Sequence, residues 1–148
     1  MRVYDIHSED FFISTDKSKM DVKEIHFFLS NYSTWSKHIS YDIVKASIEN
    51  SLNFGLFYKN KQVGFARVIS DFSTIAYLGD FFILPDFQGY GLSKILMNSI
   101  VSHNDLQGLR RWILITSTAP WLYEKYGFKK LQNNEIYMEK YDPNVYDH

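Results

Sequence analysis

Residues 85–94 read Pro-Asp-Phe-Gln-Gly-Tyr-Gly-Leu-Ser-Lys, and this stretch constrains the architecture of the chain more than any other. The apolar run 81–84 precedes it and an amphipathic helical pattern follows it, which predicts a strand, a glycine-rich turn and a helix. A helix N-terminus favours anions, and Gly89 and Gly91 lack the Cβ atoms that would keep a ligand from the backbone. We therefore expect a phosphate or pyrophosphate here, although the spacing is neither that of the P-loop nor that of the dinucleotide fingerprint.

The sequence on both sides of this stretch alternates between extended and helical hydrophobic patterns. Asp21 is positioned to cap one helix, Gly127 to end another in a left-handed conformation, and Lys59–Lys61 to turn a hairpin. In the helix expected over 41–50, Ile43, Val44, Ser47 and Ile48 are predicted to face inward. We expect strands over 11–14, 53–58, 62–69, 74–84, 111–116 and 135–139, and helices over 21–29, 41–50, 91–103 and 119–126.

This order of elements predicts an α+β (mixed α/β) protein with a central mixed, mostly antiparallel twisted sheet flanked by helices. Strand 74–84, helix 91–103 and strand 111–116 are expected to form a right-handed parallel crossover. A chain of 148 residues, 45% of them hydrophobic, can bury one core, so we expect a single domain over 1–148.

Charge and composition exclude several classes of function. The formal net charge is -1, which argues against a nucleic-acid or anionic-membrane partner. The chain has no cysteine, so disulfides, thiolate metal sites and a cysteine nucleophile are excluded. Its five histidines have no ligand spacing, and we expect no metal. Without a signal-peptide pattern or an apolar run of about 20 residues, a cytoplasmic protein is expected.

Two segments resemble the GCN5-related N-acetyltransferases, the GNAT family. The family's pyrophosphate loop is a Gln or Arg, two residues of any type, Gly, any residue, then Gly or Ala, and Gln88, Gly91 and Ser93 occupy its fixed positions. Ser93 departs slightly from that pattern. The family's second cofactor motif is similar to residues 116–128, where the matching positions are Ala119, Tyr123, Gly127 and Phe128. Thr116 stands where the family often has an Asn.

The resemblance implies a GNAT N-acyltransferase that uses acetyl-CoA and acts on a small-molecule or peptide amine, and possible homodimers. It also implies that strands 74–84 and 111–116 splay apart around the pantetheine arm, and that the amine attacks the thioester directly in a ternary complex. The cofactor-binding residues implied are Phe82, Ile83, Leu84, Gln88, Gly89, Tyr90, Gly91, Leu92, Ser93, Lys94 and Thr116.

Two residues are candidates for proton transfer. Tyr123 is the expected general acid for the departing CoA thiolate, because a phenol with a pKa of about 10 stays protonated at neutral pH. The alternatives are a packed aromatic residue and a hydroxyl that binds the CoA sulfur. Asp80 is the candidate base, on the strand face opposite Phe81, with a structural carboxylate as its alternative and His38 as a second candidate base.

The acceptor pocket is expected to be lined by Tyr32, Trp35 and Phe81, although loop aromatics can also simply cover the core. Two other functions stay open at this point: a non-catalytic CoA-binding sensor or regulator with the same fold, and a phosphate-binding module unrelated to CoA.

Overall fold

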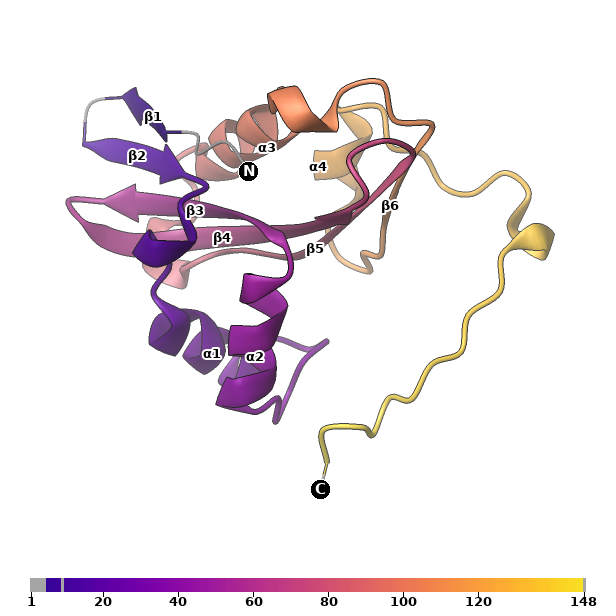
Figure 1. Ribbon diagram of the computed structural model, residues 1–148, viewed down its shortest axis with the longest axis horizontal. Helices are drawn as coiled ribbons and strands as arrows, with labels where there is room; N and C mark the ends of the chain where they lie inside the picture. The colour runs from indigo at the N-terminus through magenta and orange to yellow at the C-terminus, as the bar shows by residue number, and fades with distance from the viewer. Residues whose placement is uncertain (1–4, 9, 148) are drawn as a thin grey trace.

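The computed structural model describes residues 5–8 and 10–147, and its centre is one twisted, six-stranded sheet (Figure 1). The strands lie in chain order, β1-β2-β3-β4-β5-β6. Each of the first four neighbouring pairs is antiparallel, whereas β5 and β6 are parallel. The strands are β1 (Asp5–Ser8), β2 (Phe11–Ser14), β3 (Leu52–Tyr58), β4 (Lys61–Ser70), β5 (Ile75–Ile83) and β6 (Arg111–Leu114). The predicted mixed, mostly antiparallel sheet is confirmed.

Helices cover both faces of the sheet, with α1 and α2 on one face and α3 and α4 on the other (Figure 1). The α-helices are α1 (Val22–Asn31), α2 (Tyr41–Glu49), α3 (Leu92–Val101) and α4 (Pro120–Glu124). Short 3-10 helices lie at Lys17–Lys19, Pro85–Phe87, Asn104–Leu106 and Asn134–Ile136. None of the helices among the described residues has the length and apolar character that crossing a bilayer requires.

Local sequence signals account for most of the element boundaries. The Asp21 carboxylate accepts a hydrogen bond from the Glu24 N–H at 3.1 Å, as expected of an N-cap. Lys59 and Asn60 both have positive φ, which is the geometry of a two-residue hairpin turn between β3 and β4. The crossover from β5 through α3 to β6 connects two parallel strands, as predicted.

Two hydrophobic clusters hold the layers together. One joins α3 and α4 to the sheet and includes Leu78, Leu96 and Leu122. The other joins α1 and α2 to the opposite face, where the Phe28 and Phe82 rings stack with centroids 3.9 Å apart. Side chains of β5 therefore contribute to both clusters, and this strand carries residues to both sides of the sheet.

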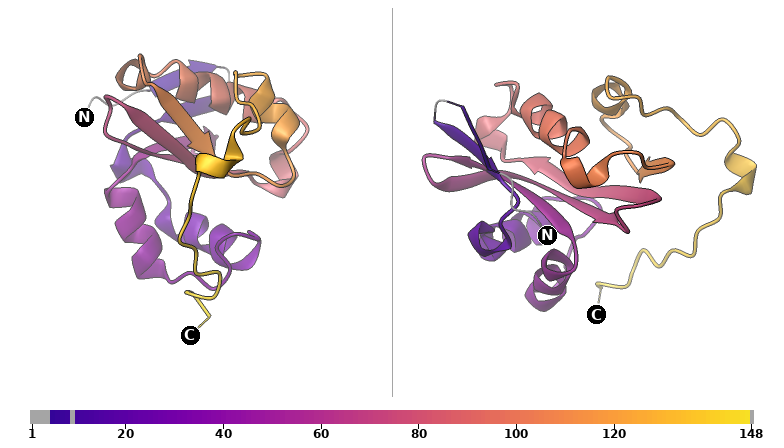
Figure 2. Two further views of the ribbon diagram at one scale, coloured as in Figure 1. Left: turned by 90° about the vertical axis from the view of Figure 1, so that its right-hand side faces the viewer. Right: turned by 45° about the horizontal axis from the view of Figure 1, so that its top comes forward.

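Two expectations from the sequence are wrong. Ile43 does not face inward but is exposed, because the buried face of α2 is limited to Val44 and Ile48. Residues 135–139 do not form a strand: the segment 129–147 has a 3-10 turn at Asn134–Ile136 and a further turn at 143–146. It runs apart from the sheet (Figure 2), and Tyr146 near its end packs against the α1–α2 cluster. A strand needs a partner for its backbone groups, and the backbone hydrogen bonds described for this segment are local.

Candidate functional site

The loop between β5 and α3 is an open turn built by two glycines with positive φ. Gly89 has φ 88° and Gly91 has φ 75°, and a Cβ added at either position would meet no protein atom within 4 Å. The Gln88 side chain closes the turn, since its Nε2 donates to the Ile83 carbonyl at 3.0 Å. The predicted glycine-rich turn is therefore present, with free space directly over its backbone.

The first turn of α3 presents donors without a protein acceptor in the described structure. Gly91 is the N-cap residue, has no side chain, and no side chain caps the helix in its place. The N–H groups of Leu92, Ser93 and Lys94 are among those that a helix leaves without an intrahelical partner. Together with the positive end of the helix dipole, they form a site whose chemistry suits a phosphate.

Strands β5 and β6 separate next to this loop. Their pairing runs from Ile75↔Arg111 to Leu78↔Leu114, where β6 ends, while β5 continues to Ile83 against β4. The Leu84 N–H donates to the Val63 carbonyl at 2.8 Å, so it is directed toward β4. Because successive backbone groups alternate in direction, the Ile83 N–H is directed to the other side, where β6 has ended.

Tyr123 lies at this separation, although it comes from α4. Its ring is buried and contacts Phe81 of β5 edge-on, with centroids 5.9 Å apart, and Phe128 at 6.1 Å. Burial raises the pKa of Tyr123 to about 12, because the phenolate would be poorly solvated there. The loop before α4 is fixed by Thr116, whose Oγ1 accepts from the Ala119 N–H at 3.1 Å.

Asp80 and Trp35 meet on the opposite face of β5. One carboxylate oxygen of Asp80 accepts from the Trp35 indole N–H at 3.0 Å, and the other accepts from Arg67 Nε at 2.9 Å. Arg67 also donates from Nη1 to the Ser51 hydroxyl at 3.0 Å. Asp80 has φ 51°, a left-handed conformation that is uncommon for a residue other than glycine. The carboxylate is thus held rigidly beneath the loop between α1 and α2.

The predicted acceptor residues divide between the two faces. Trp35 is 49% exposed and Tyr32 is 60% exposed, both in the α1–α2 loop, and Tyr32 also contacts Phe28 of α1. Phe81 instead lies with Tyr123 on the α3–α4 face. His38, the second candidate base, is exposed in the same loop.

Sequence reasoning missed the residues that hold Asp80. Arg67, Ser51 and Tyr77 were not singled out, yet Arg67 bonds both Asp80 and Ser51, and burial together with the nearby Asp80 charge raises the pKa of Tyr77. Arg67 did carry a signal: it is the only charged residue between Gln62 and Ile69, an otherwise apolar strand. A lone cation in a buried strand indicates a carboxylate partner on a neighbouring strand.

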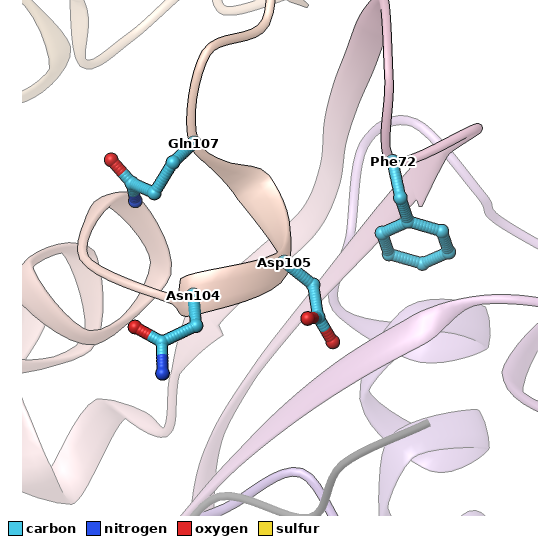
Figure 3. Close-up of a pocket in the computed structure, with 4 residues that line it drawn as sticks. All are labelled: Phe72, Asn104, Asp105 and Gln107. Atoms are coloured by element: carbon cyan, nitrogen blue, oxygen red, sulfur yellow. The ribbon is translucent and has the colours of Figure 1, made fainter.

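A surface hollow of about 550 Å³ lies away from these residues, lined by Phe72, Asn104, Asp105 and Gln107 (Figure 3). It adjoins the turn after α3, whereas the glycine-rich loop precedes α3, so the length of the helix separates the two. Among the residues that the structure describes, no three His, Cys, Asp or Glu side chains group as a metal site would require.

Comparisons with known proteins identify relatives of most of this chain. A family model described as an acetyltransferase (GNAT) domain matches residues 13–141. A candidate acetyltransferase of Gibberella zeae is 30% identical over 78% of this chain and 77% of its own length. The alanine N-acetyltransferase for ribosomal protein bS18 of Haemophilus influenzae is 30% identical over 62% of this chain and 64% of its own.

A crystal structure of a GNAT-family candidate acetyltransferase from Xanthomonas campestris superimposes with a TM-score of 0.92 at 46% identity. The match covers 96% of this chain and 100% of that one, and therefore includes most of the C-terminal segment 129–147.

Proposed function

The chain belongs to the GNAT family of acetyltransferases, and from that premise we propose that it transfers the acetyl group of acetyl-CoA to a primary amine of a small molecule or peptide. The observation that carries this proposal is the uncapped N-terminus of α3, which opens directly from the Gly89–Gly91 turn next to the separation of β5 and β6. The uncapped helix N-terminus fits the diphosphate of CoA, and the neighbouring separation of β5 and β6 fits its extended thiol-bearing arm.

The diphosphate is held by the loop and the first turn of α3. The backbone N–H groups of Leu92, Ser93 and Lys94 would donate to it from the uncapped first turn, which also carries the Ser93 hydroxyl and the Lys94 ammonium. Gly89 and Gly91 allow it close to the backbone, while Gln88 keeps the turn closed and Tyr90 lies exposed between the two glycines. Acetyl-CoA supplies the activated thioester carbonyl when it is bound.

The reacting end lies where β6 has ended. Of the predicted residues Phe82, Ile83 and Leu84, Leu84 lies just after β5 and already donates its N–H to the Val63 carbonyl. The Ile83 N–H is therefore our choice for the donor to the thioester carbonyl. A fixed backbone donor there stabilises the charge that develops on the carbonyl oxygen during attack. Thr116 fixes the β6–α4 turn on the other side of the separation.

Tyr123 is proposed as the general acid. Transfer forms a C–N bond and breaks the C–S bond, so the amine must lose a proton and the CoA sulfur must gain one. A phenol whose pKa burial raises to about 12 is fully protonated at pH 7 and can donate to the sulfur. Its contact with Phe81 fixes it beside β5, next to the proposed thioester site.

Asp80 is proposed to act on the acceptor amine. It bonds the exposed Trp35 of the α1–α2 loop, which also carries the exposed Tyr32, and its hydrogen bonds to Trp35 and Arg67 fix its direction. A carboxylate among aromatic faces attracts an alkylammonium group, and it can also take up the proton that the amine loses. Phe81 packs against Tyr123 on the other face of β5, so it would contact the acyl group rather than the amine.

Turnover of acetyl-CoA against a panel of amines tests the proposal. The panel includes small primary amines and a peptide with an N-terminal alanine, because the Haemophilus influenzae relative acts on an alanine. CoA release is read with a thiol reagent, and the absence of cysteine from the chain removes any protein background. If CoA stabilises the fold but no amine supports turnover, the chain is instead a CoA-binding sensor.

A further inference from the structure

The face of the sheet on which α1 and α2 pack is covered by these helices at one end only. Their hydrophobic cluster takes Phe65 from β4 and Phe82 from β5, which pair with each other near the end of β5 that leads into the glycine-rich loop. Toward the opposite end, the β4–β5 hairpin and β6 extend beyond both helices (Figures 1 and 2). Asp80 lies on β5 between the covered and the uncovered part of this face.

Three neighbouring strands supply apolar side chains to the uncovered part. Tyr77 of β5 pairs with Ile69 of β4 and with Ile113 of β6, and paired residues share a face of the sheet. Ala76 and Leu78, on either side of Tyr77, are buried in the α3–α4 core, so Tyr77 points to the opposite face. Ile69 is 46% exposed, and the other two are half-buried. These three residues are called the apolar strip below.

The ring of Tyr77 extends from this strip toward Asp80. A Cβ added to Gly79, which lies between the two residues, would be 2.9 Å from Tyr77 Cε1, so the ring lies over Gly79. Asp80 is held on the same face by its bonds to Trp35 and Arg67. An amine at the Asp80 carboxylate would therefore bring its neighbouring carbon atoms onto the Tyr77 ring.

The charges on this face suit an acceptor with one positive charge. Asp80 is the only carboxylate in β4, β5 and β6, and Arg67 already bonds it. A second cation, Arg111, lies at the start of β6 and pairs with Ile75 of β5. A second ammonium group on the acceptor would find no carboxylate on the apolar strip and would approach one of the two arginines, which repel it.

We propose that the acceptor is a primary monoamine with an apolar body, and that Tyr77 selects it by contact with that body. The inference rests on the proposed acetyl transfer and names the class of amine that the transfer would use. Burial of an apolar body against Tyr77 and Ile69 contributes binding free energy that a polyamine or an amino sugar lacks. A second ammonium group loses hydration there without gaining a partner.

Pentylamine and cadaverine test the inference, because they share a five-carbon chain and differ in one terminal amino group. With acetyl-CoA saturating, we expect kcat/KM for pentylamine to exceed that for cadaverine at least about tenfold. Tyr77→Ala should raise the KM for pentylamine at least about fivefold with little change in kcat, because the contact lies away from the reacting atoms. Tyr77→Phe keeps the ring and should keep the preference.

A carboxylate added to the apolar strip tests the same assignment with the Tyr77 ring left in place. Ile69→Glu gives the second ammonium of cadaverine a partner beside Tyr77, and it should raise kcat/KM for cadaverine relative to pentylamine at least about fivefold. Ile43→Glu is the matched control, because Ile43 of α2 is also 46% exposed. The control should leave the ratio unchanged, and this pair of variants stays informative if Tyr77→Ala does not fold.

A binding measurement separates this inference from the proposed activity. If no amine supports turnover, both amines are titrated into the CoA-bound protein and their dissociation constants are measured by NMR. Tighter binding of pentylamine would then support the selection even though acetyl transfer fails.

Three results overturn the inference. The first is cadaverine used or bound as well as pentylamine, or pentylamine that is neither used nor bound. The second is a folded Tyr77→Ala variant with an unchanged KM for pentylamine. The third is the same cadaverine-to-pentylamine ratio in Ile69→Glu and Ile43→Glu.

Discussion

Gly91 has two roles: its backbone adopts a positive φ, and its lack of a side chain leaves open space over the turn. Replacing it by valine tests the second role separately from the first. Gly91 has φ 75°, where an L-residue costs about 1–2 kcal/mol relative to glycine, and a β-branched residue costs more. The space above it is open to at least 4 Å, so the variant clashes with no protein atom and should fold with reduced stability. The new side chain instead occupies the space over the turn that we assign to the diphosphate.

Gly108→Val is a matched control. Gly108 has φ 74° and equally open surroundings, but it lies beyond the far end of α3. Both variants should lose similar free energy of unfolding in denaturant titrations, since both carry the same backbone strain. Calorimetry should show CoA binding weakened more than about tenfold, which is 1.4 kcal/mol, in Gly91→Val alone. Equal CoA affinity in the two variants would refute our assignment of the loop.

Further predictions concern the two faces of β5. Tyr123→Phe should lower kcat by about 10²–10⁴ with little change in CoA affinity, measured by thiol release; weaker binding at unchanged kcat would make the hydroxyl a binding contact. Because burial raises the pKa of Tyr123 to about 12, the stability that its neutral phenol contributes is complete below pH 10 and is lost as pH rises toward 12. Denaturant midpoints at pH 8 and pH 11 should therefore fall more in the wild type than in Tyr123→Phe. Arg67→Ala removes a hydrogen-bonding partner from the Asp80 carboxylate, and it should cost about 1.5–3 kcal/mol of stability and raise the KM for the amine. Arg67→Lys should not restore both the bond to Asp80 and the bond to Ser51. An unchanged KM would make the Arg67–Asp80 pair a purely structural contact.

The parts of the fold that follow from local rules could be read from the sequence. Asp21, the Lys59–Asn60 turn and the Gly91 N-cap each act through their own backbone or their nearest neighbours, and each lies where its residue type predicts. The glycine-rich loop 85–91 and helix α3 could be predicted from the sequence for the same reason. Gly127 has φ 93°, as expected of a residue that ends a helix in the left-handed region.

Contacts between distant segments could not be read in this way. The bond from Trp35 to Asp80 joins residues 45 positions apart, and it depends on where the α1–α2 loop crosses the sheet. The failed strand at 135–139 has the same origin. Its apolar run Ile-Tyr-Met between Glu135 and Glu139 suits a strand, but a strand forms only where its backbone groups pair with a neighbouring strand, and the residue types alone do not show whether they do.

An irregularity in β5 explains how one strand serves both sides of the site. Phe65 and Arg67 of β4 oppose Phe82 and Gly79, so β5 has one more residue than β4 in this interval. Before this bulge Ala76 and Leu78 face the α3–α4 core, whereas after it Phe81 does. In a regular strand Asp80 would share the face of Leu78, which would place its charge in that core.

The positive φ of Asp80 is therefore the cost of turning its carboxylate toward Trp35 and Arg67 while Phe81 turns toward Tyr123. Strain of this kind persists only where the surroundings fix it, and here two side-chain hydrogen bonds do so. Because of the bulge, Asp80 faces the proposed acceptor side of the sheet, and the next residue, Phe81, faces the proposed acyl-donor side. On this reasoning the proposed transfer would take place at residues 80–83, where the two sides are a single backbone apart.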